Sequence, residues 1–274
     1  MPNYQRFFCI CVSLVLLNAC ATLKQIVKEP TVTFKDVTPE QLSLTDGKFL
    51  FNFNVNNPNS LGVKLSKITY DLRVNEKDLI KDTLPEGIKV PAKGDAVMSI
   101  PVTVRYADLF NNLSDALKSD ALAYDLKGTM GIGPFSIPYQ HKGQLKMPKL
   151  PEISLTDVNV NKLSLNGAAI KMELKLKNPN DFDLNLSGLN YAVKLQDKEF
   201  VSGIAKNISP LSAKGETLLN LDLNISFKEL GRSALAILKG AGTKYEIKGD
   251  FLVNKPDQNE VKIPFLKSGE IPLN

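Results

Sequence analysis

Two stretches of the chain decide its fold: residues 49–59 read Phe-Leu-Phe-Asn-Phe-Asn-Val-Asn-Asn-Pro-Asn, and residues 170–180 read Ile-Lys-Met-Glu-Leu-Lys-Leu-Lys-Asn-Pro-Asn. In both stretches an apolar residue occupies every second position before the Asn-Pro-Asn. A period of two places one face of a β-strand on a core and the other face in water. Each stretch is therefore predicted to be a half-buried strand that ends in a turn.

The similarity between the two halves extends far beyond these strands. Residues 32–109 align with residues 153–230 without a gap, and sixteen of the 78 pairs are identical, where composition alone gives about five. A period this long predicts tandem domains, because solenoid repeats run about 20 to 50 residues. The pairs that recur 121 residues apart include Asn57-Pro58-Asn59 with Asn178-Pro179-Asn180, Tyr70 with Tyr191, Tyr124 with Tyr245, and Gly128 with Gly249.

The duplication divides the 274 residues into four predicted parts. A length of this size fits two ordinary domains. The join between the copies contains Pro148 and Pro151, which favour an extended and moderately stiff connection. The parts are a signal peptide at 1–19, a lipidated tether at 20–31, a first domain at 32–147 and a second domain at 152–272.

Each copy is predicted to be an all-β sandwich of six or seven short strands with one short helix. The helices are expected at residues 107–118 and 227–239, where apolar residues recur at helical spacing. In both copies the apolar phase shifts at one place, Ser66-Lys67 and Ser187-Gly188, which predicts a β-bulge. Pro101, on a predicted solvent face, indicates a strand edge or another bulge, because proline cannot donate to a ladder.

The first twenty residues predict export. The apolar run Phe7–Leu17 is too short to span a bilayer, which needs roughly twenty residues, but suits a signal peptide. Leu17-Asn18-Ala19-Cys20 resembles the bacterial lipobox, in which cleavage precedes the cysteine and its sulfur is acylated. Two or three acyl chains hold a protein firmly on a membrane. The alternative is an ordinary secretory signal or a membrane stub with an incidental cysteine.

Charge and cysteine content exclude several classes of protein. The formal net charge is +5, and neither copy contains the lysine run that nucleic-acid binding needs, so no nucleic-acid partner is expected. Cys9, Cys11 and Cys20 all precede residue 21. The domains can therefore form no disulfide and no metal–thiolate site.

No arrangement of residues predicts catalysis, a metal or a cofactor. No Ser-His-Asp set, glycine-rich phosphate loop or metal-ligand spacing occurs. His141, the only histidine, has no equivalent in the second copy and is interpreted as a solvated surface residue. Asp181 and Asp183 could hold a cation, but a solvated turn is the better interpretation. The chain is therefore predicted not to be an enzyme.

The repeated polar residues have a structural interpretation. Asparagine tolerates left-handed backbone angles and caps turns, and proline ends strand pairing. Asn57-Pro58-Asn59 and Asn178-Pro179-Asn180 are therefore interpreted as structural turns, with a ligand contact as the alternative. Tyr70 and Tyr191 are interpreted as core tyrosines with satisfied hydroxyls.

The alternating strand, the Asn-Pro-Asn, the following strand that leads to Tyr70 or Tyr191, and the later Ala-Lys-Gly together resemble the type 2 late-embryogenesis-abundant (LEA) module. This module is also called the water-stress and hypersensitive-response (WHy) domain. The resemblance covers about residues 32–147 and 152–272. It implies a fibronectin III-like or immunoglobulin-like sandwich, an association with desiccation or other stress, and no reaction.

The sequence therefore predicts a non-enzymatic envelope lipoprotein in stress protection or envelope structure, anchored to a membrane at Cys20. Ala21 after the cysteine resembles the pattern for the outer membrane of a Gram-negative cell, on its periplasmic face. Client or envelope proteins are the expected partners. The alternative is a lipid-, glycan- or protein-binding module of the envelope, and the sequence does not identify a ligand, a client or an oligomeric state.

Overall fold

Strands make up most of the described chain. The computed structural model describes residues 27–85, 87–110, 117–206, 208–230, 236–238, 242–254 and 260–272. The predicted all-β fold is confirmed, with the strands forming separate antiparallel sheets in each copy. The predicted signal peptide and Cys20 lie outside the described residues.

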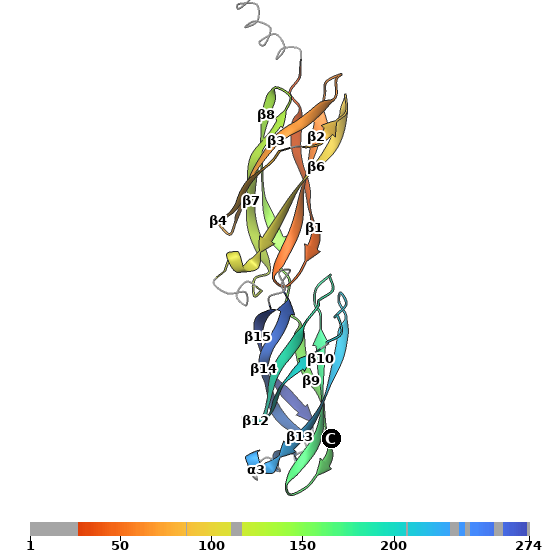
Figure 1. Cartoon of the computed structure of the whole chain (residues 1–274), viewed down its shortest axis with the longest axis vertical. Coiled ribbons are helices and arrows are strands. Elements are labelled where there is room, and N and C mark those ends of the chain that lie inside the picture. Colours follow the sequence, from red (N-terminus) through yellow and green to blue (C-terminus); the bar gives the residue numbers. More distant parts are fainter. Residues whose placement is uncertain are drawn as a thin grey trace, which may run out of the picture. The chain divides into compact units, whose positions relative to one another are not determined.

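The first copy forms a sandwich of two sheets (Figure 1). One sheet has the order β1-β2-β6, and the other has the order β4-β3-β7-β8 with β5 beside β3. The Phe53 ring of β2 lies 4.6 Å from the Tyr139 ring of β8, so the two sheets meet face to face. The strands are β1 (Thr31–Leu42), β2 (Asp46–Asn57), β3 (Val63–Val74), β4 (Lys77–Leu84), β5 (Lys89–Val90), β6 (Gly94–Arg105), β7 (Ala121–Ile132) and β8 (Phe135–Lys146).

The second copy repeats this topology, except that a single bridge between Leu184 and Leu211 replaces the pairing of β5 with β3. Its sheets have the orders β13-β10-β9 and β12-β11-β14-β15. β9 begins and ends 121 residues after β1, so the sequence offset is also a structural one. The strands are β9 (Glu152–Leu163), β10 (Gly167–Lys177), β11 (Gly188–Leu195), β12 (Lys198–Lys206), β13 (Glu216–Ser226), β14 (Gly242–Asn254) and β15 (Glu260–Pro272).

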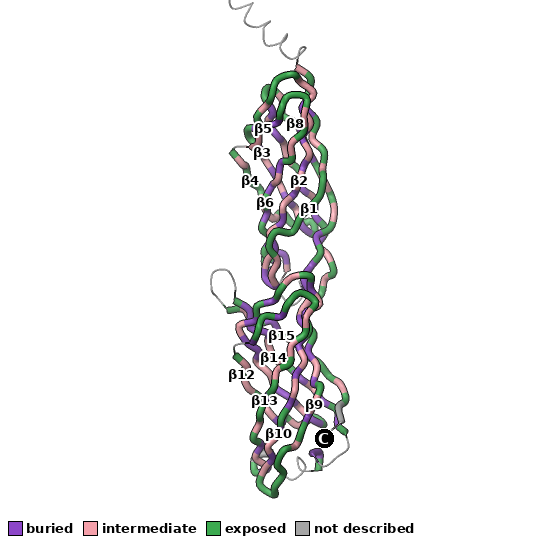
Figure 2. The backbone as a smooth tube through the Cα atoms, turned by 90° about the vertical axis from the view of Figure 1, so that its right-hand side faces the viewer, coloured by how far each residue is buried: buried purple, intermediate pink, exposed green. Residues whose placement is uncertain are grey.

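The alternating stretches that predicted the fold lie at the centre of each core. β2 and β10 are both the middle strand of a three-stranded sheet. Burial alternates along them residue by residue, as Figure 2 shows for the strands in general. Alternate residues are removed from water because pleating turns successive side chains to opposite faces. The buried members are Phe49, Phe51, Phe53 and Val55 in β2, and Ile170, Met172, Leu174 and Leu176 in β10.

The predicted irregularities are confirmed in part. The β3–β7 register shifts between Leu65 and Ile68, which is the predicted bulge in the first copy. In the second copy β11 starts only at Gly188, so the predicted bulge falls at the beginning of this strand, where the Ser187 N–H donates to the carbonyl of Leu252, the residue paired with Gly188. Pro101 lies on β6, an edge strand, as predicted.

Short helical segments stand where the two helices were predicted to begin. They are η1 (Tyr106–Asp108), a 3-10 turn, and α3 (Phe227–Leu230). Residues 236–238 are also helical. Residues 111–116 and 231–235, the middle of both predicted helices, lie outside the described residues.

Candidate functional site

The first Asn-Pro-Asn is a turn held by a buried amide. The Asn57 side chain is fully buried. Its Nδ2 donates to the carbonyl oxygens of Leu61, at 2.8 Å, and Pro91, at 2.9 Å. Its Oδ1 accepts from the backbone N–H and from the Nδ2 of Asn59, at 3.1 and 3.0 Å. One side chain thus satisfies backbone groups from the turn itself and from the segment before β6.

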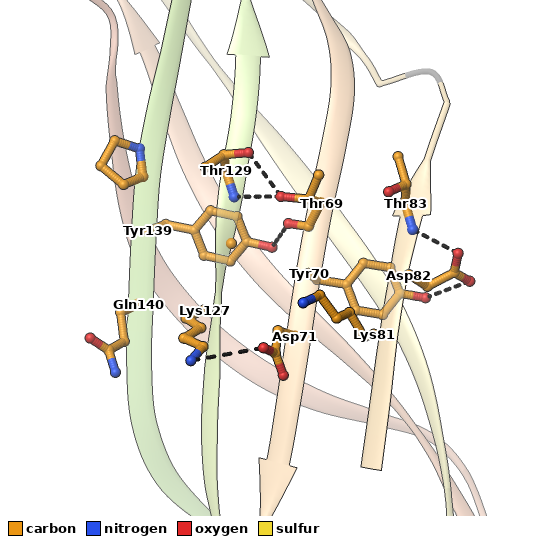
Figure 3. A pocket seen from close by; sticks show the side chains of 12 residues that line it. Thr69, Tyr70, Asp71, Lys81, Asp82, Thr83, Lys127, Thr129, Tyr139 and Gln140 are labelled. Atoms are coloured by element: carbon orange, nitrogen blue, oxygen red, sulfur yellow. Dashed lines mark hydrogen bonds and ion pairs between the residues drawn. The ribbon is translucent and has the colours of Figure 1, made fainter. Parts of the chain in front are cut away.

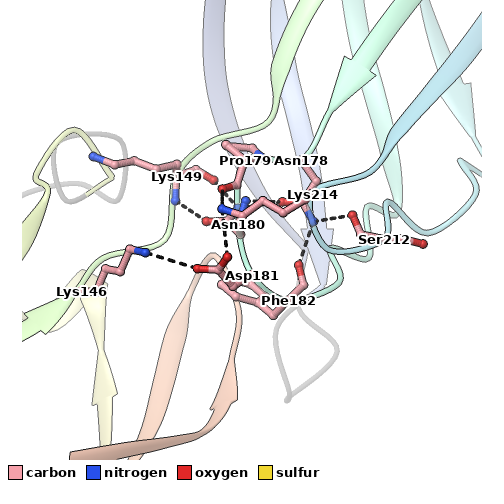
Figure 4. A network of polar contacts seen from close by, with 9 residues as sticks. All are labelled: Lys146, Lys149, Asn178, Pro179, Asn180, Asp181, Phe182, Ser212 and Lys214. Atoms are coloured by element: carbon pink, nitrogen blue, oxygen red, sulfur yellow. Dashed lines mark hydrogen bonds and ion pairs between the residues drawn. The ribbon is translucent and has the colours of Figure 1, made fainter.

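The second Asn-Pro-Asn repeats this arrangement (Figure 4). Asn178 is also fully buried. Its Nδ2 donates to the carbonyl of Phe182, at 2.7 Å, and to those of Leu211 and Ser212, both at 3.1 Å. Its Oδ1 accepts from the N–H of Asn180 at 3.0 Å. Since a buried amide bonded on both sides leaves nothing for a ligand, these contacts support the interpretation as structural turns.

The last asparagine of each turn binds the backbone of the segment that leads into its domain. Asn59 Oδ1 accepts from the N–H of Lys28 and its Nδ2 donates to the carbonyl of Lys28, both at 2.8 Å. Asn180 makes the same pair of bonds with Lys149, at 2.7 and 2.8 Å. We call each pair of bonds the asparagine clamp.

Sequence reasoning missed this clamp, although a signal existed. Lys28 and Pro30 stand 121 residues before Lys149 and Pro151, so the duplication begins before residue 32. The clamp binds the backbone of Lys28 and Lys149. Any residue type could supply these backbone groups, so the side chains at these positions do not reveal the clamp. Lys-x-Pro at the repeat offset was the only available indication.

The acidic residues after Asn180 are engaged in ion pairs and hydrogen bonds. Asp181 lies 3.0 Å from Nζ of Lys214 and 3.2 Å from Nζ of Lys146, all within one unit of the chain. These lysines lower the pKa of Asp181. Asp183 accepts from the N–H of Ala213 at 2.8 Å. Both aspartates are exposed, as the interpretation as a solvated turn expects, and both carboxylates have protein partners in place of a metal ion.

A depression of about 830 Å³ lies along the five-stranded sheet of the first copy. Cross-strand pairs line it, as Figure 3 shows: Thr69 is hydrogen-bonded to Thr129 at 2.8 Å, and Asp71 lies 3.8 Å from Lys127. Neighbouring strands of this sheet supply all of its residues. They are Thr69, Tyr70, Asp71, Lys81, Asp82, Thr83, Lys127, Gly128, Thr129, Pro138, Tyr139 and Gln140.

The second copy has an equivalent depression of about 610 Å³ with different chemistry. Asn190, Ala192 and Ile204 stand where the first copy has Thr69, Asp71 and Thr83. Ile204 is 59% exposed, and Asn190 Oδ1 is buried without a hydrogen-bond partner among the described residues. The two depressions thus lie at equivalent places but are lined by different polar groups. Their common position follows from the geometry of the sheet, so it does not define one ligand for both copies.

The two predicted core tyrosines differ. Tyr70 is buried, and its hydroxyl donates to Asp82 at 3.4 Å. Burial, followed by the Asp82 carboxylate, raises the pKa of Tyr70. Tyr191 lies over Gly203, which takes the place of Asp82 and supplies no carboxylate. Tyr70 thus fits the prediction, whereas Tyr191 is only half-buried and no hydrogen bond of its hydroxyl is found in the described part of the chain.

His141 is not the solvated surface residue that was predicted. Its ring stacks on Phe34 with the ring centroids 3.4 Å apart, and Tyr124 Oη lies 2.9 Å from its Nδ1. Burial lowers the pKa of His141. Phe34 lies on β1 and His141 on β8, so the stack joins the edges of the two sheets of the first sandwich. This contact was not predictable because the residues are far apart in sequence.

Potential metal ligands in the described part of the chain do not cluster. No group of three or more His, Cys, Asp or Glu side chains is placed to hold a metal ion in the described ranges. The single histidine is engaged with Phe34 and Tyr124. None of the helices in the described ranges is long and apolar enough to cross a membrane.

Together, the two sandwiches and their repeated turns define a tandem β-sandwich protein of the fibronectin III-like or immunoglobulin-like class. The model of the LEA_2 family, described as late embryogenesis abundant protein, matches residues 52–146 and 173–269, once in each copy. The chain therefore belongs to this family, as the resemblance predicted.

Several relatives are named for desiccation. The chain is 26% identical over 132 residues to "Late embryogenesis abundant protein Lea14-A" of Gossypium hirsutum, a match that covers 46% of this chain and 87% of that protein. It is 26% identical over 127 residues to "Desiccation protectant protein Lea14 homolog" of Glycine max, covering 46% and 83%. The solution structure of AT1g01470 from Arabidopsis thaliana matches with a TM-score of 0.37 and 26% identity, covering 45% of this chain and 85% of that one. The homologues are thus desiccation-related proteins.

Proposed function

We propose that this chain is a non-enzymatic stress-protection protein held on a bacterial envelope membrane by acyl chains at Cys20. The observation that carries the proposal is the LEA_2 match in both copies, together with relatives named as desiccation proteins. The residues that the two copies share also support the absence of enzymatic activity in this proposal. The repeated residues build turns and cores, and the only histidine belongs to one copy.

The membrane tether is proposed from the sequence of residues 1–20. Cleavage before Cys20 and acylation of its sulfur would leave a short connection to the first sandwich. The location proposed is the periplasmic face of the outer membrane if the cell is Gram-negative. Envelope or client proteins are the partners, and no nucleic acid is involved.

Protection is tested by drying a labile enzyme with the purified mature protein and measuring the activity that remains after rehydration. A plain β-sandwich of equal size and charge is the control, added at the same mass. The expected result is a larger remaining activity with this protein than with the control. Equal protection by both would remove the support for a specific protective role.

The tether is tested by mass spectrometry of the mature N-terminus. A mass that corresponds to a diacylated or triacylated Cys20 is expected from the wild-type chain, and an unprocessed signal peptide from Cys20→Ser. An unmodified Met1 in the wild-type protein would contradict both the anchor and the location.

A second candidate is an envelope-binding module for a lipid, a glycan or a protein. It is favoured by the depressions of the two sandwiches, and most specifically by Asn190, whose buried Oδ1 has no partner in the described ranges. Such an acceptor is satisfied if a ligand donates to it. Crosslinking in native membranes from position 202, an exposed serine that lines the same depression, is expected to capture this ligand, and an Ile204→Asp variant is expected to lose it. Recovery of nothing from position 202 would count against this candidate.

A further inference from the structure

The turn that carries the first asparagine clamp presents an apolar side chain to water. Leu61 is 76% exposed, although the bond from Asn57 Nδ2 to its carbonyl fixes its backbone. Two lysines are held at the same turn: Lys28 through the clamp, and Lys93 through its N–H, which donates to the carbonyl of Asn59 at 2.8 Å. Both lysines are exposed. An exposed leucine flanked by lysines has the composition of a surface that meets a membrane.

The equivalent turn of the second copy has no exposed leucine and is more acidic. Phe182 replaces Leu61 and is only half-buried, while Asp181 and Asp183 replace Ser60 and Gly62. Asp181 pairs with Lys214, the equivalent of Lys93. Residues 27–31, 59–62 and 91–94 contain two lysines and one glutamate, a net charge of +1. Their equivalents 148–152, 180–183 and 212–215 contain two lysines, one glutamate and two aspartates, a net charge of −1.

The length of the tether favours a membrane as the surface that this turn contacts. Lys28 stands eight positions after Cys20, and eight fully extended steps of the chain span at most about 28 Å. The turn is thus kept close to the membrane if Cys20 is acylated. Lysines are attracted to anionic headgroups over about a Debye length, and a leucine gains by leaving water for the acyl boundary.

We propose that the Leu61 turn of the first sandwich contacts an anionic lipid surface, with Leu61 entering the interface and with Lys28 and Lys93 facing the headgroups. This inference rests on the proposed anchor at Cys20. It assigns different surroundings to the two Asn-Pro-Asn turns. The first faces lipid, and the second, with its paired aspartates, does not.

The test places an environment-sensitive fluorophore on Leu61→Cys in the full acylated protein. Cleavage of the signal removes Cys9 and Cys11, and acylation blocks Cys20, so the new thiol is the only one free. Leu165→Cys is the matched control, because Leu165 is also exposed, at 87%, but belongs to the second copy. Circular dichroism checks that both variants fold.

On vesicles of phosphatidylcholine with phosphatidylglycerol, the label at position 61 is expected to shift to the blue and to be quenched by a lipid-borne quencher. The label at position 165 is expected to show neither effect. Ser60→Asp with Gly62→Asp, which gives the first turn the charges of the second, is expected to remove at least half of the quenching. A Cβ on Gly62 meets nothing closer than 3.4 Å, so this variant should fold.

The outcomes separate the inference from the proposal beneath it. If mass spectrometry finds no acyl group on Cys20, the anchor fails and the inference fails with it. If the protein is acylated and floats with vesicles but the label at position 61 behaves like that at 165, only the inference is overturned. Equal quenching on purely neutral vesicles would overturn the role of the lysines. A blue shift that grows with protein concentration without vesicles would indicate a second copy of the chain as the occupant and would also overturn the inference.

Discussion

The two sandwiches share their asparagine clamps and differ in what surrounds them. Asn57 and Asn178 are both completely buried, and Asn59 and Asn180 bind the same backbone groups of Lys28 and Lys149. In contrast, the first sandwich joins its sheet edges with Phe34 and His141, whereas the second has Leu155 and Lys267 at these places. The difference indicates that the buried amides are required by the fold and that the edges and turn surfaces were free to diverge.

The largest effect is expected from removing a buried amide. Asn57→Ala leaves the carbonyls of Leu61 and Pro91 and the amide of Asn59 without a partner, so the free energy of unfolding should fall by about 3 kcal/mol. Asn178→Ala should have the same effect on the second sandwich. Denaturant unfolding followed by circular dichroism measures the change, and hydrogen exchange assigns it to one copy.

Asn54→Ala is the control for this pair, because Asn54 lies on the other face of β2 and is not fully buried. It should change the free energy of unfolding by less than about 0.5 kcal/mol. If Asn57→Ala were no more destabilising than Asn54→Ala, the turn would not depend on its buried amide.

The glycines that pair with the two repeated tyrosines should be the next most sensitive. A Cβ on Gly128 would lie 1.9 Å from the carbonyl oxygen of Thr69, and a Cβ on Gly249 would lie 1.9 Å from that of Asn190. Replacement by alanine must push two strands apart, so we expect a loss of about 2 to 3 kcal/mol in either copy. Thermal unfolding with Gly62→Ala as the control measures it. Similar melting temperatures for Gly62→Ala and Gly128→Ala would disprove the close approach of the strands.

A smaller effect of opposite sign is expected at the end of β6. Tyr106 is fully buried, and its hydroxyl has no partner among the described residues, whereas the second copy has Phe227 there. Tyr106→Phe should therefore raise the free energy of unfolding by about 1 kcal/mol, and Phe227→Tyr should lower it by a similar amount. Denaturation curves of the two variants test this exchange, and a loss of stability in Tyr106→Phe would show that the hydroxyl is satisfied.

The smallest expected effect is a pH dependence of the free energy of unfolding, caused by His141 in the first sandwich. Burial places the pKa of folded His141 below its ordinary value of 6.5. The unfolded chain therefore takes up a proton at a higher pH than the folded chain, and stability is lost as the pH falls through the interval between the two values. Denaturation at pH 7.5 and pH 5 measures this loss, and His141→Gln should reduce it. The second sandwich contains no histidine, so an equal loss there would point to other groups.

Residues with a local role were predictable from the sequence, and residues with a distant partner were not. The phases of β2 and β10 follow from pleating alone, and the edge position of Pro101 follows from its missing N–H. The interpretation of Asn57 as a turn residue also came from local chemistry. In contrast, the stacking of Phe34 on His141 joins residues that only the fold brings together. The clamp binds backbone atoms, so the repeated Lys-x-Pro was its only signal in the sequence.

The clamp at Lys28 has a mechanical consequence. Residues before Lys28 would transmit any pull from a membrane anchor to the domain, and β1 begins only at Thr31. The load therefore reaches the two hydrogen bonds between Lys28 and Asn59 before it reaches the ladder between β1 and β2. Because both bonds are made by one side chain anchored through the buried Asn57, tension on the tether would be borne by the turn, and the edge strand would stay paired until the clamp opened.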